Sequence, residues 1–164
     1  MRDSFCSFCG HPFGDVSYPK VCGACSKWAH NHPRPVTAAL VPVREGLLVV
    51  RRAFEPSKGL LNLPAGYMEI GESWDVACAR EVREETSLEI DPEDIQLYGI
   101  ETPDTGYLMF FGVTPRLDYL DLSALTHDVE VTEITLYTQK DLATKLAFPT
   151  HDSAVRSFFS DRSL

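Results

Sequence analysis

Residues 66–88 read GYMEIGESWDVACAREVREETSL, a glycine-bearing loop that runs into a helix rich in acidic side chains. Glu81, Glu84 and Glu85 are spaced i, i+3 and i+4, so they share one face of that helix. Like charges at this spacing destabilise a helix by about 0.2–0.5 kcal/mol per pair. Three carboxylates on one face therefore require a positively charged partner or another group that neutralises them.

The acidic face borders the side of the helix that is expected to pack inward. The predicted helix runs from Trp74 to Glu85, with Ser73 as its N-cap, and the side that carries the acids also carries Ala77 and Cys78. Carboxylates that are partly buried must be neutralised by protons, cationic side chains or a metal ion. Carboxylate oxygens favour hard divalent cations such as Mg²⁺ or Mn²⁺.

The alternative is an ordinary surface helix with ion pairs one turn apart, such as Arg80 with Glu84. Between Glu69 and Glu89, however, seven acidic residues stand against two arginines. That excess favours the metal-binding interpretation.

The composition indicates one well-packed domain with a small appendage. The chain has 164 residues, 44% hydrophobic and 24% charged, with a net charge of −9. This charge argues against broad binding of nucleic acid, although a divalent cation could join the protein to a phosphorylated small molecule. Because we find neither a targeting segment nor an apolar run long enough to cross a bilayer, we expect a cytoplasmic protein without a membrane partner.

The first 33 residues differ in composition from the rest of the chain, because they are rich in cysteine, histidine, glycine and proline. Four cysteines form two Cys-x2-Cys pairs, Cys6 with Cys9 and Cys22 with Cys25, separated by 12 residues. Two such pairs predict a four-thiolate Zn²⁺ site of structural type, with disulfides as the competing explanation. Nearby histidines that could substitute as ligands are more readily interpreted as surface or linker residues: His11, His30 and His32.

A connector, His32-Pro33-Arg34-Pro35, separates this expected zinc ribbon (1–33) from a larger domain (36–164). In the larger domain we expect a hairpin of residues 36–43 and 47–52 around the turn Arg44-Glu45-Gly46, and Cys78 as a small buried helix residue. Three further strands complete a mixed sheet: Ile95–Glu101, Tyr107–Val113 and Val131–Thr138. Two further helices are expected, a short one at Lys140–Leu146 and a terminal one at Asp152–Ser160, with a break at Phe148-Pro149 between them.

The long acidic segment resembles the signature of the Nudix hydrolases, GX5EX7REUXEEXGU, in which U is aliphatic. This chain has Gly66, Glu72, the run Arg80–Glu85 and Leu88 at the corresponding positions, and departs only at Ser87, which stands in place of the second glycine. A glycine there would end the helix with positive φ, which costs a serine roughly 1 kcal/mol. The resemblance implies an α/β/α sandwich with a mixed sheet.

The resemblance also implies roles for individual residues. Glu81 and Glu85 would be direct ligands of Mg²⁺ or Mn²⁺, and Glu84 a ligand or a supporting partner. Gly66 would provide a backbone carbonyl ligand, and Arg80 would orient the glutamates. Glu72 would either connect the loop to the helix or hold metal-bound water. A further ligand or general base would be Glu130, which we prefer to Glu133.

A ribbon in front of such a domain resembles ADP-ribose and FAD pyrophosphatases and the NADH pyrophosphatase branch. Because ETPDTGYLMFFG (101–112) stands where the NADH branch carries a motif like SQPWPFP, we prefer ADP-ribose, FAD or a similar small nucleotide, with release of AMP. The alternatives are an NADH or NAD-cap pyrophosphatase and a non-catalytic nucleotide sensor or RNA-binding adaptor. A homodimer is expected by family analogy.

Overall fold

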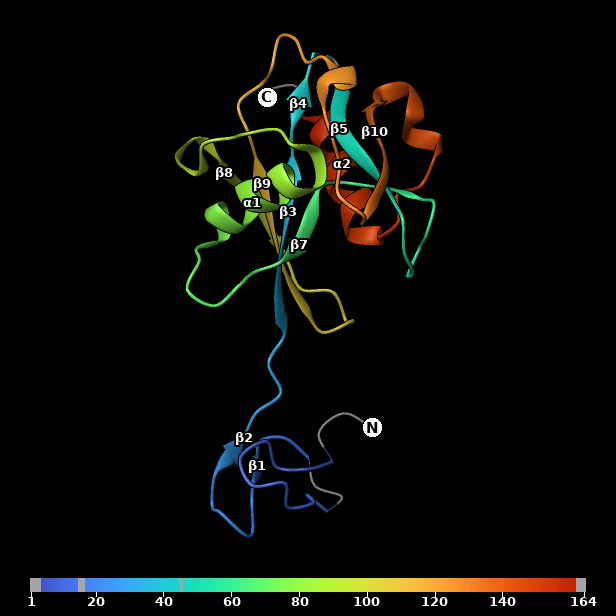
Figure 1. Ribbon diagram of the computed structural model, residues 1–164. Helices are drawn as coiled ribbons and strands as arrows, with labels where there is room; N and C mark the ends of the chain where they lie inside the picture. The colour runs from blue at the N-terminus through green and yellow to red at the C-terminus, as the bar shows by residue number, and fades with distance from the viewer. Residues whose placement is uncertain (1–3, 15–16, 45, 162–164) are drawn as a thin grey trace. The chain divides into compact units, whose positions relative to one another are not determined.

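The structure is a computed structural model that describes residues 4–14, 17–44 and 46–161. Contacts divide the described residues into two compact units (Figure 1). The first unit ends at Pro33 and the second begins at Arg34, so the boundary falls within the proline-containing connector.

The N-terminal unit is organised by two turns, each of which contains one Cys-x2-Cys pair. The amide of Gly10 donates to the carbonyl of Cys6, and the amide of Ser26 to that of Cys22, both at 2.8 Å. A short antiparallel pair, β1 (Lys20–Val21) and β2 (Trp28–Ala29), flanks the second turn. The two turns bring the sulfur atoms of Cys6, Cys9, Cys22 and Cys25 within 4.8 Å of one another.

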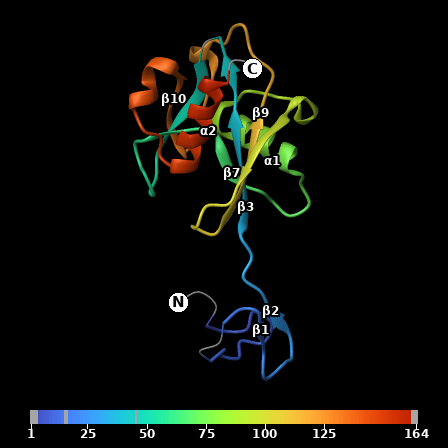
Figure 2. The same ribbon diagram turned by 180° about the vertical axis from the view of Figure 1, so that it is seen from behind.

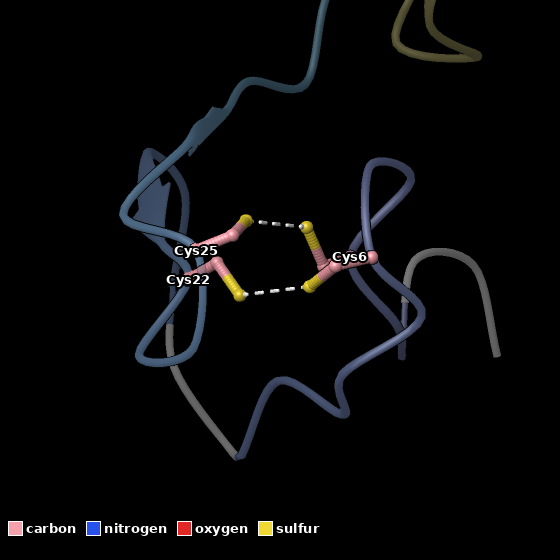
Figure 3. A group of neighbouring side chains, drawn as sticks. Cys6, Cys22 and Cys25 are labelled. Atoms are coloured by element: carbon pink, nitrogen blue, oxygen red, sulfur yellow. Dashed lines mark hydrogen bonds between the residues drawn. The ribbon is translucent and has the colours of Figure 1, made fainter.

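The spacing of these sulfur atoms fits a tetrahedral metal site. The Sγ atoms of Cys6 and Cys25 lie 3.7 Å apart and those of Cys9 and Cys22 lie 3.6 Å apart (Figure 3). A disulfide requires about 2.05 Å, whereas four sulfurs about 2.3 Å from a zinc ion lie about 3.8 Å from each other. The cluster is therefore compatible with the expected zinc ribbon, and the four thiols are free.

The C-terminal unit contains the mixed sheet that the sequence predicts, and its strands lie in the order β7-β3-β9-β8. β3 pairs parallel with β9 and antiparallel with β7, and β8 pairs antiparallel with β9. The strands are β3 (Arg34–Leu40), β7 (Ala65–Tyr67), β8 (Gln96–Glu101) and β9 (Tyr107–Val113).

A second, antiparallel sheet runs in the order β10-β5-β4, and β6 pairs with β5. Its strands are β4 (Pro42–Val43), β5 (Gly46–Arg52), β6 (Leu61–Asn62) and β10 (Val131–Thr138). Together with the mixed sheet it forms the framework on which the helices pack.

The expected hairpin of residues 36–43 with 47–52 is only partly right. The stretch divides at Val41: β3 joins the mixed sheet, and β4 alone pairs with β5. Residues 37–43 are all buried, and residues 38–43 are all apolar, so no polar residue marks the crossing from one sheet to the other. In the expected turn, Glu45 lies outside the described residues.

Two α-helices cover opposite faces of the mixed sheet, which confirms the sandwich (Figures 1 and 2). Cys78 and Val82 of α1 (Trp74–Thr86) belong to the same hydrophobic cluster as Ala39 of β3, whereas Val155 of α2 (Pro149–Ser160) belongs to the cluster that contains Ala38. Adjacent strand residues point to opposite faces, so the two helices must lie on opposite sides. Nowhere in the described ranges is a helix long and apolar enough for a membrane span.

The C-terminal helices differ from expectation at their ends. The expected helix Lys140–Leu146 is a shorter 3₁₀ turn, η3 (Gln139–Ala143). The expected break at Phe148-Pro149 is instead the start of α2, because the fixed φ of proline suits the first helical position. Two other 3₁₀ turns are η1 (Pro92–Asp94) and η2 (Leu122–Ala124).

The contact between α1 and β9 depends on Gly112. A Cβ at this position would lie 2.7 Å from Cγ2 of Ile95 and 3.0 Å from Sγ of Cys78. Cys78 is 1% exposed, and burial raises the pKa of its thiol to about 12, so it is the small buried residue that the sequence predicts.

Replacing Gly112 by alanine should lower the free energy of unfolding by about 1–3 kcal/mol, because the added methyl group overpacks this contact. Thermal or urea denaturation measures the change. Gly99→Ala is the matched control, since nothing lies within 4 Å of a Cβ at that strand position. Equal stability of the two variants would contradict the close approach of α1.

Removal of metal from the cysteine cluster should destabilise the N-terminal unit, since metal binding by four thiolates is coupled to folding of so small a module. Strong chelation, with metal loss verified by elemental analysis, should lower the melting temperature and expose the buried Phe13. An unchanged melting curve after verified removal would refute the prediction.

Candidate active site

The two ends of α1 set the position of its acidic face. Ser73 occupies the expected N-cap position in extended conformation, but its hydroxyl does not cap the helix and donates instead to the carboxylate of Asp75. At the other end, Ser87 adopts the left-handed conformation, with φ of 57°, and its amide donates to the carbonyl of Arg83 at 2.7 Å. The expected positive φ at Ser87 is confirmed.

Arg80 is the centre of the acidic cluster. Its Nε and Nη2 donate to the two carboxylate oxygens of Glu72 at 3.1 and 2.8 Å. Its Nη1 donates to Glu81 at 2.7 Å and to Glu84 at 3.1 Å. Nη2 also donates to the carbonyl of Tyr67 at 2.9 Å. One guanidinium thus holds three carboxylates and the strand that precedes the loop.

Glu72 joins the loop to the helix. Besides its bidentate contact with Arg80, it accepts a hydrogen bond from the amide of Glu69 at 2.6 Å. Hydrogen bonding from Arg80 lowers the pKa of the Glu72 carboxyl below its ordinary value. These contacts correspond to the first of the two roles suggested for Glu72.

Gly66 lies directly against the carboxylate of Glu81. A Cβ on Gly66 would be 2.2 Å from Cδ of Glu81, so a side chain at this position would displace the carboxylate. On the mixed sheet Gly66 pairs with Thr37 of β3, which fixes its backbone. The glycine is therefore required by the close approach of an acidic side chain.

Glu85 is the most deeply buried acid of the cluster, with 6% of its surface exposed. Its Oε2 accepts a hydrogen bond from the amide of Ala65 at 3.2 Å. Burial, followed by the negative charge of Glu81, raises the pKa of Glu85 well above its ordinary value. Burial raises the pKa of Glu81 as well, against the opposing effect of Arg80. Such carboxylates favour a bound cation, which would lower both pKa values.

The structure separates the two candidate acids of the later segment. Glu130 lies in a turn directly before β10, and its negative charge contributes to the raised pKa of both Glu81 and Glu85. Glu133 lies on β10 and accepts a hydrogen bond from Arg51 at 2.6 Å. Glu130 thus acts electrostatically on the cluster, whereas Glu133 is paired with a cationic side chain.

Sequence analysis missed Asp128. Its charge also raises the pKa of Glu85, and its Oδ1 accepts a hydrogen bond from the amide of Glu130 at 2.8 Å. The available signal was its position two residues before Glu130 in the same acidic segment.

Tyr67 touches the acidic cluster with its backbone carbonyl and carries an exposed ring on edge strand β7. Tyr67 is 51% exposed, and its ring centroid lies 6.2 Å from that of Tyr107. The guanidinium of Arg34 lies 4.8 Å from the centroid of Tyr107 and 5.6 Å from that of Tyr67. Because Gly66 faces Glu81 of α1, the next residue, Tyr67, directs its side chain to the other face of the mixed sheet, where Tyr107 packs against the cluster that contains α2.

Comparison with known proteins gives one family match and several relatives. A crystal structure of a NUDIX hydrolase from Nitrosomonas europaea superposes with a TM-score of 0.81 and 24% identity over 97% of this chain and 92% of that chain. A bifunctional NMN adenylyltransferase/ADP ribose pyrophosphatase from Francisella tularensis, complexed with AMP and a Mn ion, superposes with a TM-score of 0.62 and 19% identity over 79% of this chain and 42% of that chain. Both likenesses concern the fold.

Among curated proteins, the NAD-capped RNA hydrolase NudC of Edwardsiella ictaluri is 29% identical over 89 residues. This match covers 52% of the present chain and 34% of the relative, so the chain spans about a third of the length of the curated relatives it matches. The model of the NUDIX domain matches residues 32–158, a range that contains the acidic cluster and both sheets. The chain therefore belongs to the Nudix family.

Proposed function

We propose that this protein is a divalent-cation-dependent pyrophosphatase that hydrolyses the diphosphate of a nucleoside diphosphate derivative, such as ADP-ribose or FAD, and releases AMP. One observation carries the proposal: Glu81 and the buried Glu85 face the backbone of β7, and the described hydrogen bond to Glu85 comes from a neutral amide. Carboxylates so placed are suited to binding a cation.

The chain's own residues supply the positioning that this reaction needs. Glu81 and Glu85 would be direct ligands, with Glu84 and the carbonyl of Gly66 as further oxygens, while Arg80 holds Glu81 and Glu84 in place. A Mg²⁺ or Mn²⁺ ion in this site would neutralise diphosphate oxygens and lower the pKa of water.

In the hydrolysis itself, a water oxygen forms a bond to one phosphorus and the bond from that phosphorus to the bridging oxygen breaks. The phosphate that leaves is already a stable anion, so charge neutralisation and alignment dominate. The proton of the water needs an acceptor near the acidic face. We assign Glu130 to this task or to a further ligand position, since its charge acts on Glu81 and Glu85.

The surface of Tyr67 and Tyr107 supports a substrate with an aromatic ring. The exposed ring of Tyr67 lies on the edge strand β7, whose backbone also meets Glu81 and Glu85, so a nucleobase stacked on it could extend its diphosphate around the sheet edge to the carboxylates. The Francisella relative, named an ADP ribose pyrophosphatase and complexed with AMP and a Mn ion, is consistent with this substrate class.

A second candidate is hydrolysis of NADH or of NAD caps on RNA. It is favoured by the curated relatives, which are named NAD-capped RNA hydrolases. The segment 101–112, which lacks the expected motif of that branch, favours ADP-ribose or FAD instead. A third candidate is a non-catalytic nucleotide sensor or RNA-binding adaptor. It does not explain why Glu85 is buried and Glu81 partly buried beside β7.

Glu81→Gln and Glu85→Gln should each lower AMP release by about 100-fold or more, because each removes a charge that the cation needs. Chromatography of products under Mg²⁺ and under Mn²⁺ measures the change, with ADP-ribose, FAD, NADH, NAD⁺ and NAD-capped RNA as substrates. Glu133→Gln is the matched control, because Glu133 pairs with Arg51 outside the cluster.

Retained turnover in both variants would end the proposal. Preferred cleavage of NADH or of the capped RNA would select the second candidate. Nucleotide or RNA binding without hydrolysis of any substrate would select the third.

Gly66→Ala should impair the same site by displacing the Glu81 carboxylate. Since the end of a glutamate side chain can move, the fold should persist while AMP release falls by about tenfold or more. Circular dichroism and steady-state kinetics measure the two effects separately. Gly99→Ala again serves as control, and wild-type kinetics for Gly66→Ala would show that this contact is dispensable.

A further inference from the structure

The helix-ending residue Ser87 has a conformation that favours glycine, yet its side chain makes two hydrogen bonds. Its Oγ donates to the carbonyl of Thr86 at 2.6 Å and accepts from the amide of Thr126 at 2.9 Å. The second bond joins the end of α1 to a segment that lies 39 residues further along the chain. A glycine would meet the backbone requirement but would offer no acceptor to Thr126.

The segment that follows Thr126 is short and is held at both ends. Before it, Leu122 and Leu125 pack against the same hydrophobic cluster as α1. After it, the carbonyl of Glu130 accepts a hydrogen bond from the amide of Ala53 at 2.8 Å. Between the two anchors, only residues 127–130 span the gap, and all four are exposed.

These exposed residues include the two acids that act on the cluster. Asp128 and Glu130 are joined by the hydrogen bond from the amide of Glu130 to Oδ1 of Asp128. Beside the larger effect of burial, the negative charges of both contribute to the raised pKa of Glu85, and that of Glu130 contributes to the raised pKa of Glu81. Because the segment buries little apolar surface, its position depends on its anchors.

We propose that Ser87 is a positioning residue: its hydroxyl holds the start of residues 126–130 against the end of α1 and so sets the place of Asp128 and Glu130 beside the last turn of the helix, which carries Glu84 and Glu85. The inference rests on the proposed function, because those two acids would complete the cation site or accept the proton of water. The backbone of Ser87 thus ends the helix. The side chain of Ser87 links the acids of α1 to the acids of residues 126–130, which are far apart in the sequence.

Two substitutions separate the hydroxyl from the backbone. Ser87→Gly removes the hydroxyl and relieves the left-handed conformation, whereas Ser87→Ala removes the hydroxyl and keeps the Cβ. Both variants should raise the half-saturating Mn²⁺ concentration, measured by electron paramagnetic resonance, by about tenfold. The melting temperature of Ser87→Gly should be equal to or higher than that of Ser87→Ala.

Amide exchange provides a readout that needs neither metal nor turnover. Without the hydroxyl, the amide of Thr126 and those of residues 127–130 should exchange faster, while amides within α1 keep their protection. Ser123→Ala is the matched control, because the hydroxyl of Ser123 bonds to Asp121 in the same connection and does not contact α1. It should leave both Mn²⁺ binding and exchange unchanged.

A double-mutant cycle with Glu130→Gln tests the route of the effect. If Ser87 acts by placing Glu130, Ser87→Gly should change Mn²⁺ half-saturation less than about twofold in that background. Wild-type Mn²⁺ binding and exchange in Ser87→Gly, or an undiminished tenfold effect in the Glu130→Gln background, would overturn the inference. Absence of hydrolysis in the wild-type protein would instead refute the proposed function, since Mn²⁺ binding and exchange are measured without substrate.

Discussion

The contacts of the Arg80 guanidinium are the interaction on which the acidic cluster depends. They join Glu81 and Glu84 on the helix to Glu72 and the carbonyl of Tyr67 on the preceding segment. Four acceptors on one planar cation fix both the loop and the rotamers of the glutamates. Without it, three neighbouring carboxylates would lose their shared positive charge, and a buried charge without a partner is strongly unfavourable. Arg80 therefore allows so acidic a helix to pack inward.

Close packing of that helix depends on two glycines of the mixed sheet. Gly112 on β9 admits Cys78, and Gly66 on β7 admits the carboxylate of Glu81. The helix face that meets the sheet is thus apolar near its start and acidic near its end. The same docking that buries Cys78 brings Glu81 and Glu85 against the backbone of β7. The packing of the core and the assembly of the acidic cluster therefore depend on the same docking of α1.

The sequence predicts those parts of the molecule whose signals are local. Strands β9 and β10 have the predicted bounds, because each is a compact apolar or alternating run between turn residues. The division at Val41 could not be predicted, since residues 37–43 are buried on both faces and carry no mark of which sheet they join. Asp128 was missed for a related reason: its proximity to Glu85 arises from a loop whose path depends on distant anchors. Local pattern identifies the helix acids, and tertiary contacts add the rest.

The two sets of candidate metal ligands differ in chemistry, and each set matches its surroundings. The four cysteines offer soft thiolates at the spacing of a closed tetrahedral shell, which leaves no position for a substrate. The glutamates offer hard oxygens on a half-open face: Glu85 is buried, whereas the side chain of Glu84 is 46% exposed. A chain with a net charge of −9 repels a diphosphate unless cations intervene. The negative charge that argues against nucleic-acid binding would also repel a phosphorylated substrate unless a cation lay between them. The half-open glutamate site is where such a cation is favoured, because its carboxylates are partly buried.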